Sequence, residues 1–140
     1  MLILLSVLNL FLSASSHRDP LKKTNLKVEI QNVRVVSGAV YIGLFRPGKD
    51  FPEGKSIETK KLNVNSKNVY ILFSVEPGDY AIAVYHDEND NGKMDKRVFG
   101  IPKEPYGFSN NFKPVMSAPK FSDCRFSVGD DGKAISIKLI

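Results

Sequence analysis

Residues 68–86 read NVYILFSV-EPGD-YAIAVYH, and this stretch decides the fold that the sequence predicts. In the first part, apolar residues occupy every second position, which is typical of a β-strand with one buried face. The residues expected on that face are Val69, Ile71, Phe73 and Val75. The second part, Tyr80–His86, is an almost wholly apolar strand-like run. Pro77 and Gly78 between the two parts suit the centre of a type II turn, so we expect a hairpin.

The N-terminal half contains further strand-like segments separated by turn residues. Leu26–Gln31 alternates apolar with polar residues, whereas Ala39–Phe45 is apolar on both faces, which is typical of a central strand. Ile57–Val64 is more polar and suits the edge of a sheet. No segment of the chain has the periodicity of an amphipathic helix, so the domain is predicted to be all-β.

The C-terminal part combines an irregular stretch with a second predicted hairpin. Residues 98–119 hold four prolines and no clear periodicity, which predicts a long loop of the kind that is usually functional. Phe121–Val128 and Ala134–Leu139 are strand-like arms on either side of a Gly-Asp-Asp-Gly turn. The side chains expected to be buried on these arms are Cys124, Phe126, Val128, Ile135, Ile137 and Leu139. The lone Cys124 is therefore interpreted as a small core residue.

These segments predict a single domain over residues 26–140. About seven strands with turns every 8 to 12 residues are typical of a two-sheet sandwich. We therefore predict an all-β fold, a sandwich of about seven antiparallel strands that is immunoglobulin-like or prealbumin-like. With 140 residues, 42% of them hydrophobic and nine of them Phe, the chain can fill one core.

The first sixteen residues carry no charge and end in small residues, which is typical of a secretory signal peptide. We predict a signal peptide at 1–16, a linker at 17–25, and a secreted or periplasmic mature protein; a buried helix is the alternative. The apolar run is too short to span a bilayer, so no integral membrane segment is expected.

The net charge of +5 is spread thinly over the sequence, and it predicts no nucleic-acid face. We expect a monomer with an envelope protein or glycan as partner.

Oxygen-bearing side chains follow the Tyr80–His86 run at every second position. They match places 1, 3, 5 and 9 of a D-x-N-x-N-G calcium loop, with Gly92 at place 6, where the backbone turns sharply. The predicted ligands are the side chains of Asp87, Asn89, Asn91 and Asp95 and the backbone carbonyl of Lys93. Such spacing suits Ca²⁺ because this ion takes six to eight oxygen ligands.

The predicted site lacks one ligand of a full calcium loop. Place 12 is Val98, where a bidentate Glu would stand, so further ligands must come from water or from a distant side chain such as Glu104. Binding should then be weak, with a Kd on the order of 10⁻⁴ to 10⁻³ M. The alternative is a type I′ turn at Asn91-Gly92, in which the neighbouring side chains only satisfy backbone groups.

His86 admits a hydrolase as the alternative function, acting with Asp87 or Ser109. Adjacent strand residues point to opposite faces, however, and no G-x-S-x-G elbow precedes Ser109. A zinc site is not favoured either, because the mature chain offers only His17, His86 and Cys124 as ligands. We expect no catalytic residue, and we expect His86 to bind a backbone carbonyl of the 98–119 loop.

The segment Tyr106–Phe112 could be a sugar- or peptide-binding surface, or its aromatic side chains could pack the loop against the domain. Packing is favoured.

Three segments carry a resemblance to a known family: PGDYAIAVYHD at residues 77–87, the Asp and Asn pattern up to Asp95, and GIPKEPYGFSNN at residues 100–111. They closely resemble DUF2141, a family of bacterial exported proteins without an established activity. The resemblance implies a secreted or periplasmic compartment, and it implies no reaction. The loop itself is similar to the calcium loops of adhesin B-type repeats, which sit on prealbumin-like sandwiches. The sequence thus predicts a non-enzymatic envelope module with a calcium-stabilised loop.

Overall fold

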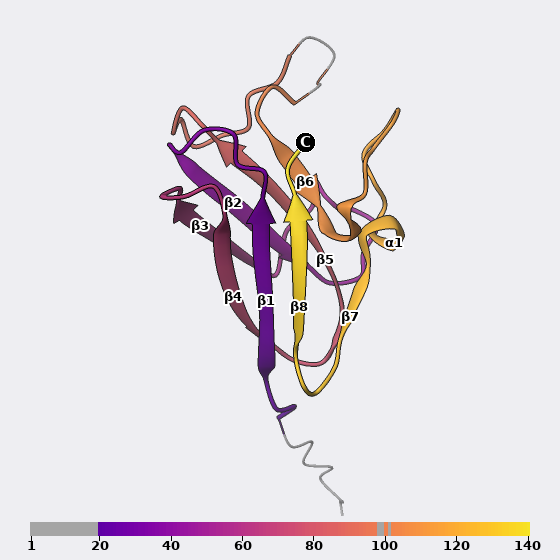
Figure 1. Cartoon of the computed structure of the whole chain (residues 1–140). Helices are drawn as coiled ribbons and strands as arrows, with labels where there is room; N and C mark the ends of the chain where they lie inside the picture. Colours follow the sequence, from indigo (N-terminus) through magenta and orange to yellow (C-terminus); the bar gives the residue numbers. More distant parts are fainter. Residues whose placement is uncertain (1–19, 98–99, 101) are drawn as a thin grey trace, which may run out of the picture.

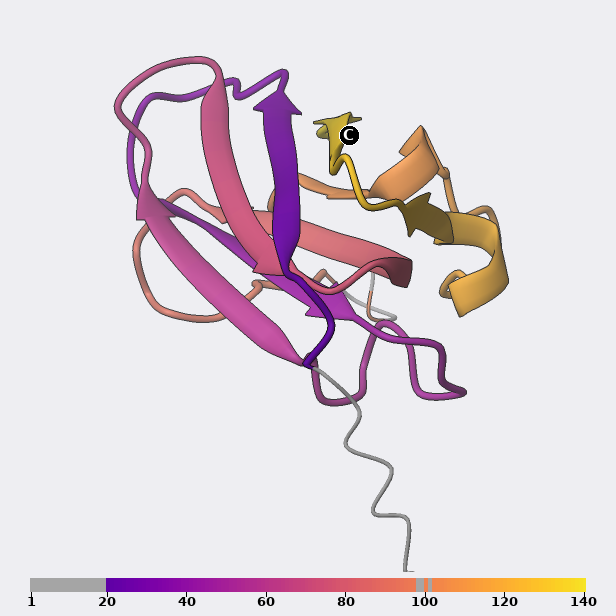
Figure 2. The same ribbon diagram turned by 90° about the horizontal axis from the view of Figure 1, so that it is seen from below.

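Eight strands form two sheets in the computed structural model of the chain, which describes residues 20–97, 100 and 102–140. Figure 1 shows their arrangement, and Figure 2 shows the sheets as two layers with the short helix α1 at one side. The first sheet has the order β4-β1-β8, with β1 at Thr24–Gln31, β4 at Val69–Val75 and β8 at Lys133–Lys138. The second has the order β3-β2-β5-β6, with β2 at Ala39–Phe45, β3 at Glu58–Asn63, β5 at Gly78–Asp87 and β6 at Tyr106–Phe108. The predicted two-sheet sandwich is confirmed.

Three short elements complete the fold: β7 at Phe126–Val128, the 3₁₀ helix η2 at Ser109–Asn111 and α1 at Phe121–Cys124. β7 pairs with the first residues of β5 and is the fifth strand of the second sheet. Within the described residues, no helix has the length and apolar character needed to cross a membrane. The predicted signal peptide and the first residues of the predicted linker lie outside the described residues.

The core lies between the two sheets, where the alternating apolar residues of the strands meet. Leu26, Val28 and Ile30 of β1 are all buried, as their alternation predicts. All four predicted residues of β4 are buried as well, and they face the Ile82 and Val84 side chains in one cluster. Full burial of each such side chain stabilises the fold by about 1.5–3 kcal/mol. β2 is central and β3 lies at an edge, as predicted.

The predicted hairpin of residues 68–86 is wrong, although both of its strands exist. β4 pairs with β1, whereas β5 pairs with β2 in the other sheet. The Pro77-Gly78 link therefore passes from one layer to the other, and the Gly78 φ of +153° differs from the value of about +80° in a type II turn. Alternation identifies the buried face of a strand, but it does not identify the strand that forms its backbone hydrogen bonds. The turn residues alone therefore could not show that the two strands lie in different sheets.

The C-terminal hairpin is confirmed at its turn, where Gly129 and Gly132 form an antiparallel bridge, but the predicted pairing of its arms is wrong. Residues 121–124 form α1 rather than a strand, β7 pairs with β5, and β8 pairs with β1 in parallel. The sandwich is therefore not wholly antiparallel. The predicted burial is confirmed in full for Cys124, Phe126, Val128, Ile137 and Leu139, and Ile135 is half-buried.

The predicted irregular stretch at 98–119 contains β6, which pairs with the middle of β5. Residues 98, 99 and 101 lie outside the described residues. Tyr106, Phe108 and Phe112 belong to a second apolar cluster, together with Phe45, Phe51, Cys124 and Phe121. The interpretation of Tyr106–Phe112 as packing is thus confirmed. This cluster covers the outer face of β5 and fixes the course of the chain between β5 and α1.

Candidate calcium site

Asp87 is the last residue of β5, and the chain turns directly after it. Its side chain is 0% exposed, and its two carboxylate oxygens accept the backbone N–H groups of Asn91 at 3.1 Å and Gly92 at 2.8 Å. Gly92 has a φ of +78°, which glycine adopts without steric cost. A type I′ turn would also need a positive φ at Asn91, and Asn91 does not have one. The type I′ geometry of the alternative is therefore wrong. Its other part agrees with the structure, because the side-chain oxygens of Asp87, Asn89 and Asn91 accept backbone N–H groups of the loop.

The other predicted side chains converge on Asp95. The Asn89 amide donates to the Asp95 carboxylate at 2.8 Å, and the Asn91 amide donates to both of its oxygens at 2.9 Å. These hydrogen bonds, first that of Asn91 and then that of Asn89, lower the pKa of Asp95 below its ordinary value. The backbone N–H of Lys93 donates to the Asn91 side-chain oxygen at 3.1 Å, which holds Lys93 against the same loop. The structure thus brings all five predicted residues into one loop.

Glu104 joins the loop from the chain segment that follows it. This carboxylate is only 6% exposed, and it accepts the N–H of Glu88 at 3.1 Å with one oxygen and the N–H of Asp95 at 3.0 Å with the other. The backbone N–H of Lys103 also donates to the Asp95 carbonyl at 2.8 Å. Glu104 therefore holds the two ends of the loop together.

Two buried carboxylates, those of Asp87 and Glu104, lie in this small region. Among the described residues, neither Asp87 nor Glu104 has a Lys, Arg or His nitrogen within 4.0 Å. Buried charges in proteins are usually paired or bound to metal, because removing an ion from water is costly. In the described part of the chain, no three His, Cys, Asp or Glu side chains gather as a metal-binding group.

A segment before β2 supports the loop from the other side, and sequence reasoning missed it. The Arg34 guanidinium makes a two-pronged ion pair with Glu88, with contacts of 2.7 and 3.1 Å. The Ser37 hydroxyl donates to the Glu88 carbonyl at 3.2 Å. Gly38 lies so close to the Asp87 carbonyl that a Cβ there would sit 1.9 Å from its oxygen. The glycine directly before a strand was the only sequence signal for these contacts.

His86 is a structural residue, but its hydrogen-bond acceptor differs from the predicted one. Nε2 lies 2.7 Å from the carbonyl oxygen of Ser37, which can only accept, so Nε2 donates. The 98–119 stretch is instead bound through the His86 backbone N–H, which donates to Pro105 at 2.8 Å. Nδ1 is buried without a hydrogen-bond partner among the described residues and lies 3.9 Å from the Glu88 carboxylate.

The residues of the alternative hydrolase reading do not come together. The Ser109 hydroxyl is buried, accepts the N–H of Ile82 at 2.9 Å and donates to the Cys124 carbonyl. Ile82 and His86 are four residues apart on β5, which at about 3.3 Å per residue separates them by roughly 13 Å. Asp87 turns its carboxylate into the loop. The Cys124 thiol is buried too, and this burial raises its pKa to about 12.

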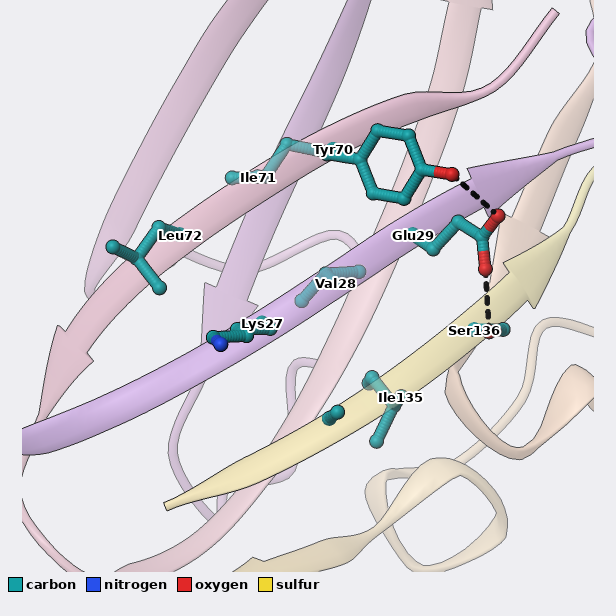
Figure 3. A pocket seen from close by; sticks show the side chains of 9 residues that line it. Lys27, Val28, Glu29, Tyr70, Ile71, Leu72, Ile135 and Ser136 are labelled. Atoms are coloured by element: carbon teal, nitrogen blue, oxygen red, sulfur yellow. Dashed lines mark hydrogen bonds between the residues drawn. The ribbon is translucent and has the colours of Figure 1, made fainter.

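An open depression of ≈ 500 Å³ lies on the outer face of the first sheet (Figure 3). At its centre the Glu29 carboxylate accepts the hydroxyl groups of Tyr70 at 3.2 Å and Ser136 at 3.1 Å. Gln31 and Asn68 donate to the same carboxylate. Since its oxygens already join β4, β1 and β8, Glu29 is a cross-strand link of the sheet.

Comparison with known proteins gives one match. No curated protein and no solved structure matches the chain. A family described as "Uncharacterized protein conserved in bacteria (DUF2141)" matches residues 28–136. The matched range runs from β1 to β8 and includes the whole loop with Glu104, so it covers most of the sandwich. The chain belongs to the DUF2141 family of bacterial proteins.

Proposed function

We propose that this protein is an exported, non-enzymatic β-sandwich module of the bacterial cell envelope whose Asp87–Asp95 loop binds calcium. The observation that carries the calcium site is the pair of buried carboxylates, Asp87 and Glu104, which have no Lys, Arg or His nitrogen within 4.0 Å among the described residues. A divalent cation at the loop would compensate their charge.

The loop has oxygens to spare for an ion. A carboxylate offers about four lone-pair sites, and Asp87 uses two of them for backbone N–H groups. The Asn89 and Asn91 amides point their N–H groups at Asp95. A half-turn of each amide would present its oxygen to Asp95 instead, an arrangement that is repulsive unless a cation lies between. The same half-turn would break the hydrogen bonds that these oxygens accept from the Asn91 and Lys93 N–H groups, so the ion must compensate for their loss as well. Calcium would thus replace one set of hydrogen bonds with a set of ligand bonds.

The test is a thermal unfolding measurement of the chain from His17 onward in chelator and in 10 mM CaCl₂, with MgCl₂ as the ion control. Binding stabilises the folded state by RT ln(1 + [L]/Kd), or about 1.4 kcal/mol at ten times Kd. A domain of this size then melts several degrees higher. Asp95→Asn should remove this rise, whereas Asp131→Asn, on the exposed turn before β8, should keep it. Equal melting of wild type in chelator and calcium would contradict the site.

The export part of the proposal rests on the uncharged apolar start of the chain and on the signal-peptide pattern that ends near Ser15. A C-terminally tagged protein expressed in a bacterial host should appear outside the cytoplasm, with a mature N-terminus near Ser16 or His17. Cell fractionation and N-terminal sequencing measure this. Cytosolic protein that still begins at Met1 would refute export and would leave the calcium test unaffected.

A further inference from the structure

The loop between η2 and α1 exposes two apolar side chains at its tip. Val115 is 92% exposed and Met116 is 96% exposed, more than any other large hydrophobic residue described. Figure 1 shows this segment as an orange loop that projects away from the sheets beside α1. Adjacent apolar side chains that are fully in water at a projecting tip point to something that covers them.

The base of this tip loop is anchored to the body of the protein. Phe112 before it and Phe121 after it pack against the second apolar cluster, and Pro119 is buried. Pro114 and Pro119 bracket the tip, and each fixes its own φ near −65°. The Lys120 N–H donates to the Asp123 carboxylate at 2.8 Å and so fixes the return into α1. The tip is therefore presented on a supported base, and little conformational freedom is lost when it is covered.

The surroundings of the tip are basic. The loop KPVMSAPK, residues 113–120, begins and ends with an exposed lysine and contains no acidic residue. At its base lies an open depression of ≈ 590 Å³, with Lys49 of the neighbouring loop and Lys120 on its rim and Phe51 and Phe121 in its wall. Asp50 follows Lys49, and the Asp123 carboxylate lies at the Lys120 N–H, so both carboxylates offset part of this charge. A negatively charged group beside the tip would thus meet two or three lysines.

We propose that the 113–120 loop docks this protein on an anionic phospholipid surface. Val115 and Met116 enter the boundary between headgroups and acyl chains, while Lys113, Lys120 and Lys49 meet the phosphates. A protein partner fits less well, because two side chains on a narrow tip bury far less than the roughly 1,000 Å² of a stable protein interface. A bilayer needs only a few inserted apolar side chains with basic residues beside them. The proposal does not depend on calcium.

The first experiment is flotation with vesicles of phosphatidylcholine containing 30% phosphatidylglycerol, in EDTA so that calcium cannot bridge protein and lipid. We expect the protein to float with these vesicles. We expect its binding to vesicles of phosphatidylcholine alone to be at least about tenfold weaker. Val115→Ser/Met116→Ser should weaken it by a similar factor. The matched control is Val35→Ser/Val36→Ser, a second adjacent and exposed apolar pair. The contribution of the lysines is tested by comparing the vesicle binding of the Lys113→Gln/Lys120→Gln variant with that of the Lys67→Gln/Lys133→Gln control.

The second experiment uses the absence of tryptophan from the sequence. Met116→Trp places a single reporter at the tip, and its emission should shift to the blue and be quenched by brominated acyl chains when anionic vesicles are added. Leu72→Trp, on the outer face of β4, should show neither effect. Equal vesicle binding by the Val115→Ser/Met116→Ser variant, or unchanged Met116→Trp emission, would overturn the proposal. Tip-dependent self-association without vesicle binding would overturn it as well and would make a second copy the partner.

Discussion

Gly38 shows how a single residue limits what the candidate site tolerates. It has a φ of +67°, and a Cβ at this position would lie 1.9 Å from the Asp87 carbonyl oxygen, so an added methyl group must displace the start of the loop. We expect Gly38→Ala to lower the free energy of unfolding by more than 2 kcal/mol, at the upper end of about 0.5–3 kcal/mol for ordinary substitutions. Urea denaturation measures this. Gly48→Ala, whose new Cβ would have its nearest neighbour at 3.8 Å, is the control. A Gly38→Ala protein as stable as this control would contradict the close contact.

The Arg34–Glu88 pair gives the loop a predictable pH dependence. The hydrogen bond from Arg34 lowers the pKa of Glu88 below its ordinary value of 4.5. The ionised form is thus favoured by folding, and its stabilising contribution is fully present above about pH 4.5 and is lost as pH falls through the lowered pKa. For a pair this exposed, that contribution is at most about 1 kcal/mol.

Arg34→Gln should therefore destabilise the protein slightly at pH 7, by less than about 1 kcal/mol, and leave it unchanged at a pH well below the folded pKa of Glu88. Denaturation curves at several pH values measure the difference between the two proteins. Arg97→Gln is a charge-matched control, since Arg97 is exposed. A constant difference at all pH values would mean that Arg34 acts through packing rather than through Glu88.

Among the elements, the strands themselves could be predicted, whereas their partners could not. The alternation in Leu26–Gln31 and Asn68–Val75 identifies a buried face because it depends only on the strand's own residues. Pairing depends on residues far away: β1 pairs with β8, and Ile30 lies opposite Ile137. Turn residues such as Pro77-Gly78 connect strands of one sheet or of two sheets equally well. Both predicted hairpins failed for this reason.

The same division applies to the candidate site. The spacing of Asp87, Asn89, Asn91 and Asp95 is local, so their gathering in one loop was predictable from the sequence. Glu104 could be named only as a candidate, because nothing local indicates that it reaches Glu88 and Asp95. The contacts from Arg34 and Ser37 connect residues about fifty positions apart, and apart from the neighbouring Gly38 the sequence carries no signal for them.

Glu104 connects two elements of the site, and its substitution tests that connection. Glu104→Gln replaces one acceptor oxygen with an N–H group, which must then face the N–H of Glu88 or of Asp95. A buried donor without an acceptor costs about 1–3 kcal/mol, so the stability should fall by that amount. Any calcium-induced rise of the melting temperature should shrink as well. Glu53→Gln, at an exposed position of the 46–56 loop, is the control. Equal denaturation midpoints of the two variants would contradict the role of Glu104.

At the scale of the whole molecule, the parallel pairing of β1 and β8 joins the two ends of the described chain. Such long-range pairs slow folding, because a large loop must close before the contacts stabilise it. We expect refolding on the millisecond-to-second timescale, measured by stopped-flow tyrosine fluorescence. Ile137→Val should cost about 0.5–1.5 kcal/mol and mainly speed unfolding, if β8 joins after the transition state. Microsecond refolding would contradict this dependence on topology.

The buried thiol of Cys124 has a consequence for the covalent chemistry of the molecule. With a pKa of about 12, only about one thiol in 10⁵ is ionised at neutral pH, and the thiolate is the form that attacks a disulfide. Cys124 also belongs to the second apolar cluster and is fully buried there, out of reach of another chain. Two copies that meet therefore have no route to a crosslink through sulfur, even in oxidising surroundings. Burial of the single cysteine thus prevents the folded chain from forming disulfide-linked dimers. Only unfolding would expose the thiol and allow such dimers to form.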